Sequence, residues 1–129
     1  MDATAIDHVN LNIPSDGVDE AIAFYESLGF EADRLDEYES GEKPFFSIRL
    51  TEGAVLHLWP DEEFTPPSGE NYDHVAIRVA DSIEEVKETL DAADIEIENE
   101  MTPLGATGTA PAVYVIDPFG YRVELKTDG

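Results

Sequence analysis

The chain has 129 residues, of which 42% are hydrophobic, so it can form one packed domain or two small halves that share a core. Its 30 acidic and 7 basic residues, spread along the whole chain, give a net charge of −23, which excludes nucleic acid and anionic membranes as expected partners. Cysteine is absent, which excludes disulfides, thiolate nucleophiles and cysteine-ligated zinc.

The N-terminal half reads as a strand, a helix and three further strands. The stretch IDHVNLNI, residues 6–13, alternates apolar and polar side chains, as a half-buried strand does. Apolar residues then recur at helical spacing from Val18 to Leu28, and Gly29 stands where a glycine commonly ends a helix. Three strands are predicted to follow, at 30–38, 44–51 and 53–59.

The same order of elements repeats after a Pro-containing linker at 61–71. The stretch YDHVAIRV, residues 72–79, is predicted to be a strand and carries the same Asp-His-Val triplet as the first strand. A helix is predicted next, because Asp81 and Glu84 resemble a capping box and apolar residues follow at helical spacing as far as Leu90. Strands are expected at 94–99, 111–117 and 120–127, with DPFG as the tight turn between the last two.

Internal duplication explains the shared element order, triplet and spacing better than coincidence does. It predicts a single α+β domain made of two βαβββ modules, at 1–60 and 72–129. The loop at 99–111, which contains two glycines and two prolines, is predicted to be either a lid over a site or an ordinary exposed connection.

All three histidines fall on predicted strands. His8 and His74 lie on the face opposite to the apolar residues, and His57 shares its face with Val55 and Trp59. His57 follows His8 by 49 residues, and the residue 50 positions after His74 is Glu124, on the equivalent strand of the second half. If the halves pack with pseudo-twofold symmetry, these four side chains converge.

Imidazole nitrogens and a carboxylate are suitable ligands for zinc, iron, manganese, nickel or cobalt. We therefore expect one divalent metal ion per site, held by His8, His57, His74 and Glu124. Taken singly, each histidine is better explained as a hydrogen-bonded structural residue, and Glu124 as one of the 30 acids. The equivalent strand positions of all the histidines nevertheless favour the metal site.

Three stretches carry a resemblance to a known family: DHVNLNI leading into DEAIAFYESLGF, then YDHVAIRV, and finally YVIDPFGYRVEL. In these the chain resembles the vicinal oxygen chelate superfamily, which includes glyoxalase I, extradiol dioxygenases and bleomycin-resistance proteins. The resemblance covers essentially the whole chain. It implies that two βαβββ modules form a curved mixed sheet around a central cleft, in a protein that is often a homodimer. It also implies that a divalent metal chelates oxygens of a small-molecule substrate.

Within this superfamily the chain is most similar in build to glyoxalase I. That resemblance implies a metal-dependent lyase or isomerase in which Glu124 moves the substrate proton through an enediolate-type intermediate. The chain departs from glyoxalase I at His57, where those enzymes usually carry glutamate, so Glu124 is the remaining candidate base. They also use an arginine four residues after the first histidine, where this chain has Asn12.

Three further residues are candidates for substrate binding. Arg78 lies four residues after His74, at the pseudo-symmetric place of the missing arginine, and is expected either to anchor an anionic group or to form a structural ion pair. Asn10 shares the face of the first histidine. Tyr114 is either a substrate-contacting hydroxyl or an aromatic residue that lines the sheet.

Two alternative functions remain open. YVIDPFGYRVE fits the signature of Fe(II) extradiol ring-cleaving dioxygenases, although GATGTA stands where their upstream catalytic histidine would lie. A non-enzymatic module that binds an antibiotic-type small molecule is the other alternative. The N-terminus lacks signal-peptide character and no stretch is long and apolar enough for a membrane span, so a cytoplasmic protein is expected. The acidic surface indicates the salt-rich cytosol of a halophile.

Overall fold

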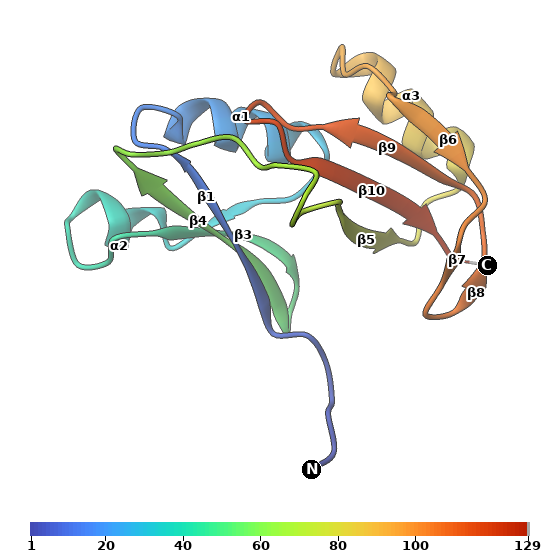
Figure 1. The fold of residues 1–129 in the computed structure, drawn as a ribbon, viewed down its shortest axis with the longest axis horizontal. Coiled ribbons are helices and arrows are strands. Elements are labelled where there is room, and N and C mark those ends of the chain that lie inside the picture. Colours follow the sequence, from blue (N-terminus) through green and yellow to red (C-terminus); the bar gives the residue numbers. More distant parts are fainter. Residues whose placement is uncertain (129) are drawn as a thin grey trace. The chain divides into compact units, whose positions relative to one another are not determined.

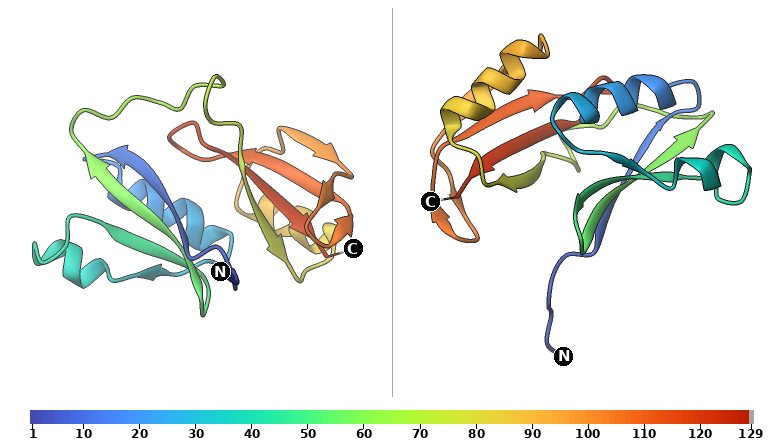
Figure 2. Two further views of the ribbon diagram at one scale, coloured as in Figure 1. Left: turned by 60° about the horizontal axis from the view of Figure 1, so that its bottom comes forward. Right: turned by 180° about the vertical axis from the view of Figure 1, so that it is seen from behind.

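The computed structural model describes residues 1–128, which divide into two compact units. The first unit is Met1–Thr65 and the second begins at Pro66, so the division falls inside the segment 61–71. Each unit contains one four-stranded mixed sheet and one helix of ten residues (Figures 1 and 2). The predicted α+β fold of two βαβββ modules is therefore confirmed. Within residues 1–128 no helix combines the length and apolar character needed to cross a bilayer.

The first unit has a sheet in the order β1-β4-β3-β2, in which β1 runs parallel to β4 and the other pairs are antiparallel. Its elements are β1 (His8–Pro14), α1 (Val18–Ser27), β2 (Ala32–Asp33), the short α2 (Leu35–Glu39), β3 (Phe46–Thr51) and β4 (Ala54–Asp61). The helix α1 buries Ala21 and Tyr25, and β1 buries Leu11 and Ile13. Gly29 has φ +96°, which places it in the left-handed conformation expected just after the end of α1.

The predicted strand at 30–38 is wrong beyond Asp33, because the chain forms α2 instead. Arg34 has φ +60° and adopts a left-handed conformation, which breaks the extended backbone. Asp36 and Glu37 then occupy the first turn of α2, where carboxylates are favourable, and Glu37 pairs with Arg34 at 3.2 Å.

The second unit repeats this topology with a sheet in the order β5-β10-β9-β6, in which β5 runs parallel to β10. Its elements are β5 (Val75–Val79), α3 (Ile83–Ala92), β6 (Asn99–Met101), β9 (Ala112–Ile116) and β10 (Arg122–Thr127), and a separate hairpin consists of β7 (Leu104–Gly105) and β8 (Gly108–Thr109). This hairpin lies between β6 and β9, which is the position that α2 occupies in the first unit. The loop predicted at 99–111 therefore contains ordered strands.

Two predictions in the second unit were wrong by a few residues. The strand expected at 94–99 begins only at Asn99, because Asp94 has φ +57° at the end of α3 and the chain needs several residues to reach the edge of β9. The capping box of α3 is formed by Ser82 and Glu85 instead of Asp81 and Glu84. Ser82 has the extended backbone that an N-cap residue requires.

Replacing Ser82 by alanine should lower the free energy of unfolding by about 1 kcal/mol. The Ser82 hydroxyl accepts a hydrogen bond from the Glu85 backbone N–H at 3.2 Å, and the Glu85 carboxylate accepts one from the Ser82 N–H at 2.8 Å. Urea denaturation at pH 7 measures the loss, and the exposed Ser15, which lies outside every helix, provides the control substitution Ser15→Ala.

The capping box should also make the start of α3 sensitive to acid. The hydrogen bond that the Glu85 carboxylate accepts from the Ser82 backbone N–H lowers the pKa of the Glu85 carboxyl below its ordinary value of 4.5. The interaction of the carboxylate with the Ser82 side chain lowers this pKa further. The contribution of Glu85 is thus present above pH 4.5 and is lost as the pH falls through the lowered pKa. Glu85→Gln should destabilise the protein at pH 7 and become nearly neutral in strong acid.

Candidate functional site

The candidate ligands lie on the sheet faces that do not pack into the hydrophobic cores. In β1 the side chains of Leu11 and Ile13 are buried, while His8 and Asn10 on the opposite face are exposed. In β5 Ile77 is buried and Arg78 is exposed. Period-two alternation along each strand produces this separation, so the polar residues of each strand share one surface.

The first unit brings His8 and His57 together, with their ring centroids 4.4 Å apart. The His8 Nδ1 lies 2.8 Å from the Asp7 carboxylate, and the His57 Nδ1 lies 2.9 Å from the Ser47 hydroxyl. When each Nδ1–H donates in these contacts, each Nε2 carries the lone pair that a metal requires. The first unit therefore presents two oriented imidazoles on one surface.

The environment of His57 keeps its imidazole neutral. Burial lowers the pKa of His57 below its ordinary value, and the neighbouring charge of His8 lowers it further. Metals bind the neutral imidazole, so proton competition at this position is weak near neutral pH.

The second unit brings His74 and Glu124 together, with Nε2 and Oε2 only 3.0 Å apart. The His74 Nδ1 hydrogen-bonds to the Asp73 carboxylate, which directs the Nε2 lone pair toward Glu124. Two lone-pair atoms at this distance require either a shared proton or a shared cation. Donors at about 2.1 Å from one octahedral ion also stand about 3.0 Å apart, so the pair fits a metal.

Glu124 on β10 is only 4% exposed, and β9 pairs with β10 beside it. Tyr114 on β9 lies directly opposite Glu124 in the sheet register. Burial raises the pKa of Tyr114, and the negative charge of Glu124 raises it further, so the phenol stays protonated as a donor. The Arg122 guanidinium lies 5.1 Å above the Tyr114 ring and pairs with Glu98 at 2.7 Å, so the ring packs against a cation that is itself held in place.

The turn before β10 determines where Glu124 enters the sheet. The buried Asp117 carboxylate accepts hydrogen bonds from the backbone N–H groups of Phe119 and Tyr121, both at 2.9 Å. Gly120 has φ +97°, a conformation that favours glycine, and completes the turn. The DPFG stretch thus acts as a rigid connection that sets the register of β10.

Sequence reasoning missed the residues that orient the donors. Ser47 lies opposite His57 in the β3–β4 register, the position that Tyr114, already a candidate from the sequence, occupies opposite Glu124 in the β9–β10 register. The repeated aspartate before each histidine, visible in both Asp-His-Val triplets, was the signal for Asp7 and Asp73. Nothing in the sequence around Ser47 distinguishes it from an ordinary strand serine.

The donor chemistry of the two pairs fits a divalent ion, since it consists of oriented imidazoles and a buried carboxylate. In residues 1–128 no group of three or more His, Asp or Glu side chains is positioned to hold a metal ion, so each unit by itself presents two donors. The four-ligand site stays a prediction.

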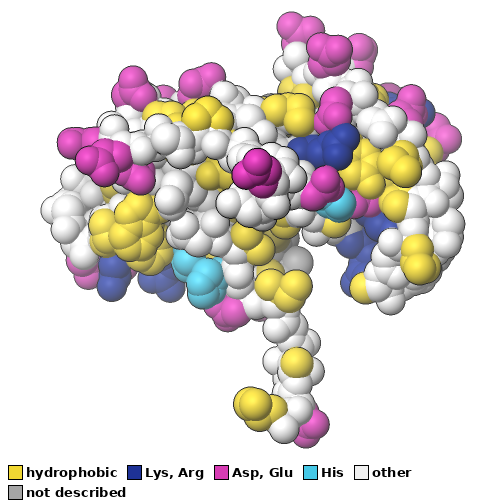
Figure 3. All heavy atoms as spheres, in the orientation of Figure 1, with side chains coloured by type: hydrophobic (Ala, Val, Ile, Leu, Met, Phe, Trp, Pro, Cys, Tyr) yellow, Lys and Arg dark blue, Asp and Glu magenta, His cyan; other side chains and the backbone are white. Residues whose placement is uncertain are grey.

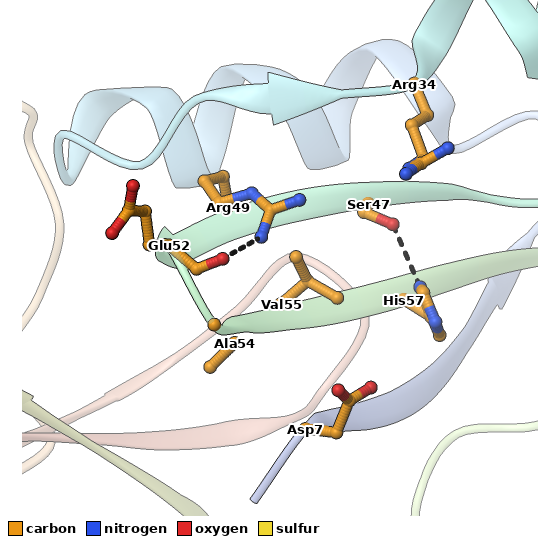
Figure 4. Close-up of a pocket in the computed structure, with 9 residues that line it drawn as sticks. Asp7, Arg34, Ser47, Arg49, Glu52, Ala54, Val55 and His57 are labelled. Carbon is orange, nitrogen blue, oxygen red and sulfur yellow. Dashed lines mark hydrogen bonds between the residues drawn. The ribbon is translucent and has the colours of Figure 1, made fainter. Parts of the chain in front are cut away.

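A hollow of about 260 Å³ adjoins His57 in the first unit. Figure 4 shows Asp7, Ser47 and Arg49 around it, with the hydrogen bond between Ser47 and His57. The Arg49 guanidinium forms an ion pair with the Asp33 carboxylate at 2.7 Å. Asn10 does not line this hollow, and its amide donates to the Asn12 side chain at 2.9 Å.

A second hollow, of about 290 Å³, adjoins the donor pair of the second unit. Its wall includes His74 and Glu124, together with Arg78 and Lys126 from the same two strands. The β7–β8 hairpin supplies the remaining wall, through Leu104, Gly105, Ala106 and Thr107. In Figure 3 Asp and Glu side chains (magenta) are scattered over the visible face, and histidine (cyan) and Lys or Arg (dark blue) side chains appear at fewer places.

Ser47→Ala should weaken metal binding about tenfold, because hydrogen bonds to ligating imidazoles typically contribute 10- to 100-fold to affinity. Isothermal titration of chelator-treated protein with Zn²⁺ or Ni²⁺ measures the change. Ser40→Ala, whose hydroxyl contacts only the Glu37 carbonyl oxygen, should bind metal as the wild type does. Equal metal affinity of the Ser47 variant and the wild type would show that Ser47 does not support the metal site.

A family model of the Glyoxalase/Bleomycin resistance protein/Dioxygenase superfamily matches residues 5–125. The chain belongs to this superfamily. The resemblance to the vicinal oxygen chelate superfamily is thereby confirmed. No curated protein sequence matches the chain. Homodimer formation, a cytoplasmic location and adaptation to high salt stay predictions.

Solved structures share the fold over nearly the whole chain. A glyoxalase family protein from Bacillus anthracis is 26% identical with a TM-score of 0.77, covering 100% of this chain and 98% of that protein. A virulence protein from Salmonella typhimurium is 25% identical with a TM-score of 0.76, covering 100% of both chains. A lactoylglutathione lyase from Agrobacterium tumefaciens is 22% identical with a TM-score of 0.68, covering 98% of this chain and 95% of that protein, and at this identity shares the fold alone.

Proposed function

We propose that the protein is a divalent-metal-dependent lyase or isomerase of the glyoxalase type. Glu124 takes a proton from a carbon beside a substrate carbonyl and returns it to the neighbouring carbon, through an enediolate-type intermediate. The observation that carries this proposal is the buried Glu124 carboxylate, which lies 3.0 Å from His74 and lines a hollow of about 290 Å³. Superfamily membership supports the same reaction class.

The ligands of the proposed metal are His8, His57, His74 and Glu124, and the ion is nickel, zinc, cobalt, manganese or iron. A bound divalent ion supplies Lewis-acid polarisation of adjacent substrate oxygens. Asp7, Asp73 and Ser47 orient the imidazoles through their Nδ1 atoms.

The Tyr114 hydroxyl has a separate role in this proposal. It lies opposite Glu124 in the β9–β10 register and contacts the substrate beside the proposed base. The proposal also assigns Asn10 and Arg78 to substrate binding, with Arg78 in the hollow beside Glu124.

Elemental analysis of protein purified without chelator, followed by paired assays with a hemithioacetal and a catechol, tests the proposal. Bound nickel, zinc or cobalt with isomerisation of the hemithioacetal is the expected result. A chain without metal that binds ligand tightly would instead be a sequestration module, and the enzymatic proposal would fail.

An Fe(II) extradiol dioxygenase is the second candidate. Tyr114 lies opposite Glu124 in the β9–β10 register, where its hydroxyl could contact a phenolic substrate, and two histidines with Glu124 would form a 2-His-1-carboxylate set. Iron in the purified protein, with oxygen uptake on catechol, would favour this candidate over the isomerase.

A further inference from the structure

The few cations of this chain are unequally neutralised. Of the 7 basic residues, four pair with carboxylates: Arg34 with Glu37, Arg49 with Asp33, Arg122 with Glu98, and Lys87 with Glu100. Among residues 1–128, Lys43, Arg78 and Lys126 pair with no carboxylate. Lys43 is exposed to solvent, whereas Arg78 and Lys126 line the same hollow in the second unit.

Lys126 is buried, with an exposed fraction of only 5%. Its Nζ donates to the Gly108 carbonyl oxygen at 3.1 Å. A carbonyl oxygen accepts a hydrogen bond but does not neutralise the charge, and a buried ammonium without a counter-ion is costly. The Glu124 carboxylate lines the same hollow, but among residues 1–128 no carboxylate forms an ion pair with Lys126, which leaves its charge available to a bound anion.

Arg78 stands directly opposite Lys126 in the parallel register of β5 and β10. Its Nη1 lies 3.4 Å from the Thr107 hydroxyl of the hairpin, a long contact that leaves most guanidinium donors for other partners. Like charges opposite each other in a sheet repel. An anion between the two side chains would convert this repulsion into two charge-assisted contacts.

We propose that Arg78 and Lys126 bind the carboxylate or phosphate group of a small substrate in this hollow. The anion subsite itself is independent of the proposed function. The assignment of the other end of the substrate to the reaction at Glu124 rests on that function. Glu124 precedes Lys126 by two residues on the same face of β10, which is about 7 Å along a strand. One molecule of a few carbon atoms spans both positions, and a hollow of about 290 Å³ accommodates it.

The hairpin fixes where the Lys126 ammonium lies. A Cβ on Gly105 would stand 2.6 Å from Lys126 Cε, so the absence of a side chain at Gly105 lets the hairpin pack on the lysine stem. Gly105→Ala therefore displaces the ammonium while every charge is retained. We expect this variant to bind the anion several-fold more weakly.

Calorimetric titration with inorganic phosphate and, separately, with acetate tests the subsite in chelator-treated protein. The wild type should bind at least one of the two anions with one site per chain. Lys126→Met and Arg78→Gln should each raise the Kd about tenfold or more, as the loss of a charge-assisted contact does. Lys43→Met makes the same charge change outside the hollow and should leave the Kd within about twofold, since solvent screens an exposed charge.

The outcomes separate the subsite from the proposed function. No binding of either anion by the wild type, or equal weakening by Lys43→Met and Arg78→Gln, would overturn the subsite. If Lys126→Met fails to fold, the Kd of the Arg78→Gln variant tests the subsite, because Arg78 is exposed. If elemental analysis finds no metal in a protein that still binds the anion, that result would support the subsite and contradict the proposed metal-dependent enzyme. Preference for phosphate or for acetate identifies the anionic group of the substrate.

Discussion

Replacing Glu124 by glutamine should lower kcat about 100- to 10,000-fold, the range that a general base contributes, while KM changes far less. Glutamine has the shape of glutamate and can still accept hydrogen bonds through its carbonyl oxygen, but it cannot take up a proton at neutral pH. Substrate binding through the other residues of the hollow therefore persists.

Steady-state kinetics with a hemithioacetal, together with the metal content of each sample, measures this effect. The matched control is Glu62→Gln, which removes the same charge at an exposed position outside both hollows. Wild-type turnover in the metal-loaded Glu124 variant would show that the assigned base is wrong.

Removing either donor pair should abolish metal binding, with an affinity loss of at least about 100-fold. The double variants are His8→Ala with His57→Ala, and His74→Ala with Glu124→Ala. Two donors alone hold a divalent ion weakly, because protein sites for zinc and its neighbours use three or four ligands. Elemental analysis after dialysis, combined with calorimetric titration of Zn²⁺, measures stoichiometry and affinity.

Stoichiometry distinguishes one shared ion from two separate ions. If the four side chains serve one ion, each double variant loses it completely. If metal content falls only from two ions per chain to one, the pairs are separate sites and the four-ligand hypothesis is wrong. Asp73→Asn should have an intermediate effect of about tenfold, because it removes the carboxylate that orients His74 but no ligand.

The strongest periodic signals in the sequence predicted the fold correctly. The alternation around His8 and His74 identified both first strands, and Gly29 marked the end of α1. These features depend on local backbone preference and on the partition of apolar side chains, which a single sequence displays directly.

The errors arose where a local choice depends on tertiary contacts. Arg34 carries no sign of a left-handed backbone in its residue type, yet that conformation replaces part of a predicted strand with α2. Asp81 and Ser82 are both good N-cap residues, so the pattern left the start of α3 uncertain by one position.

The candidate donors were found by counting between equivalent strands, which relies on the duplication. Ser47 could not be found in this way, because Tyr114, which occupies the same register in the other module, differs from it in chemistry. Only the hydrogen bond to His57 in the folded chain reveals the role of Ser47.

The two modules differ most between their second and third strands, where one carries α2 and the other carries the β7–β8 hairpin. This junction accepts unrelated inserts without disturbing the strands that bear the histidines and Glu124. Directed evolution of new substrate preference should therefore begin with libraries confined to residues 102–110. Such libraries reshape the wall around Arg78 and Lys126 while the strands that bear the candidate donors keep their geometry.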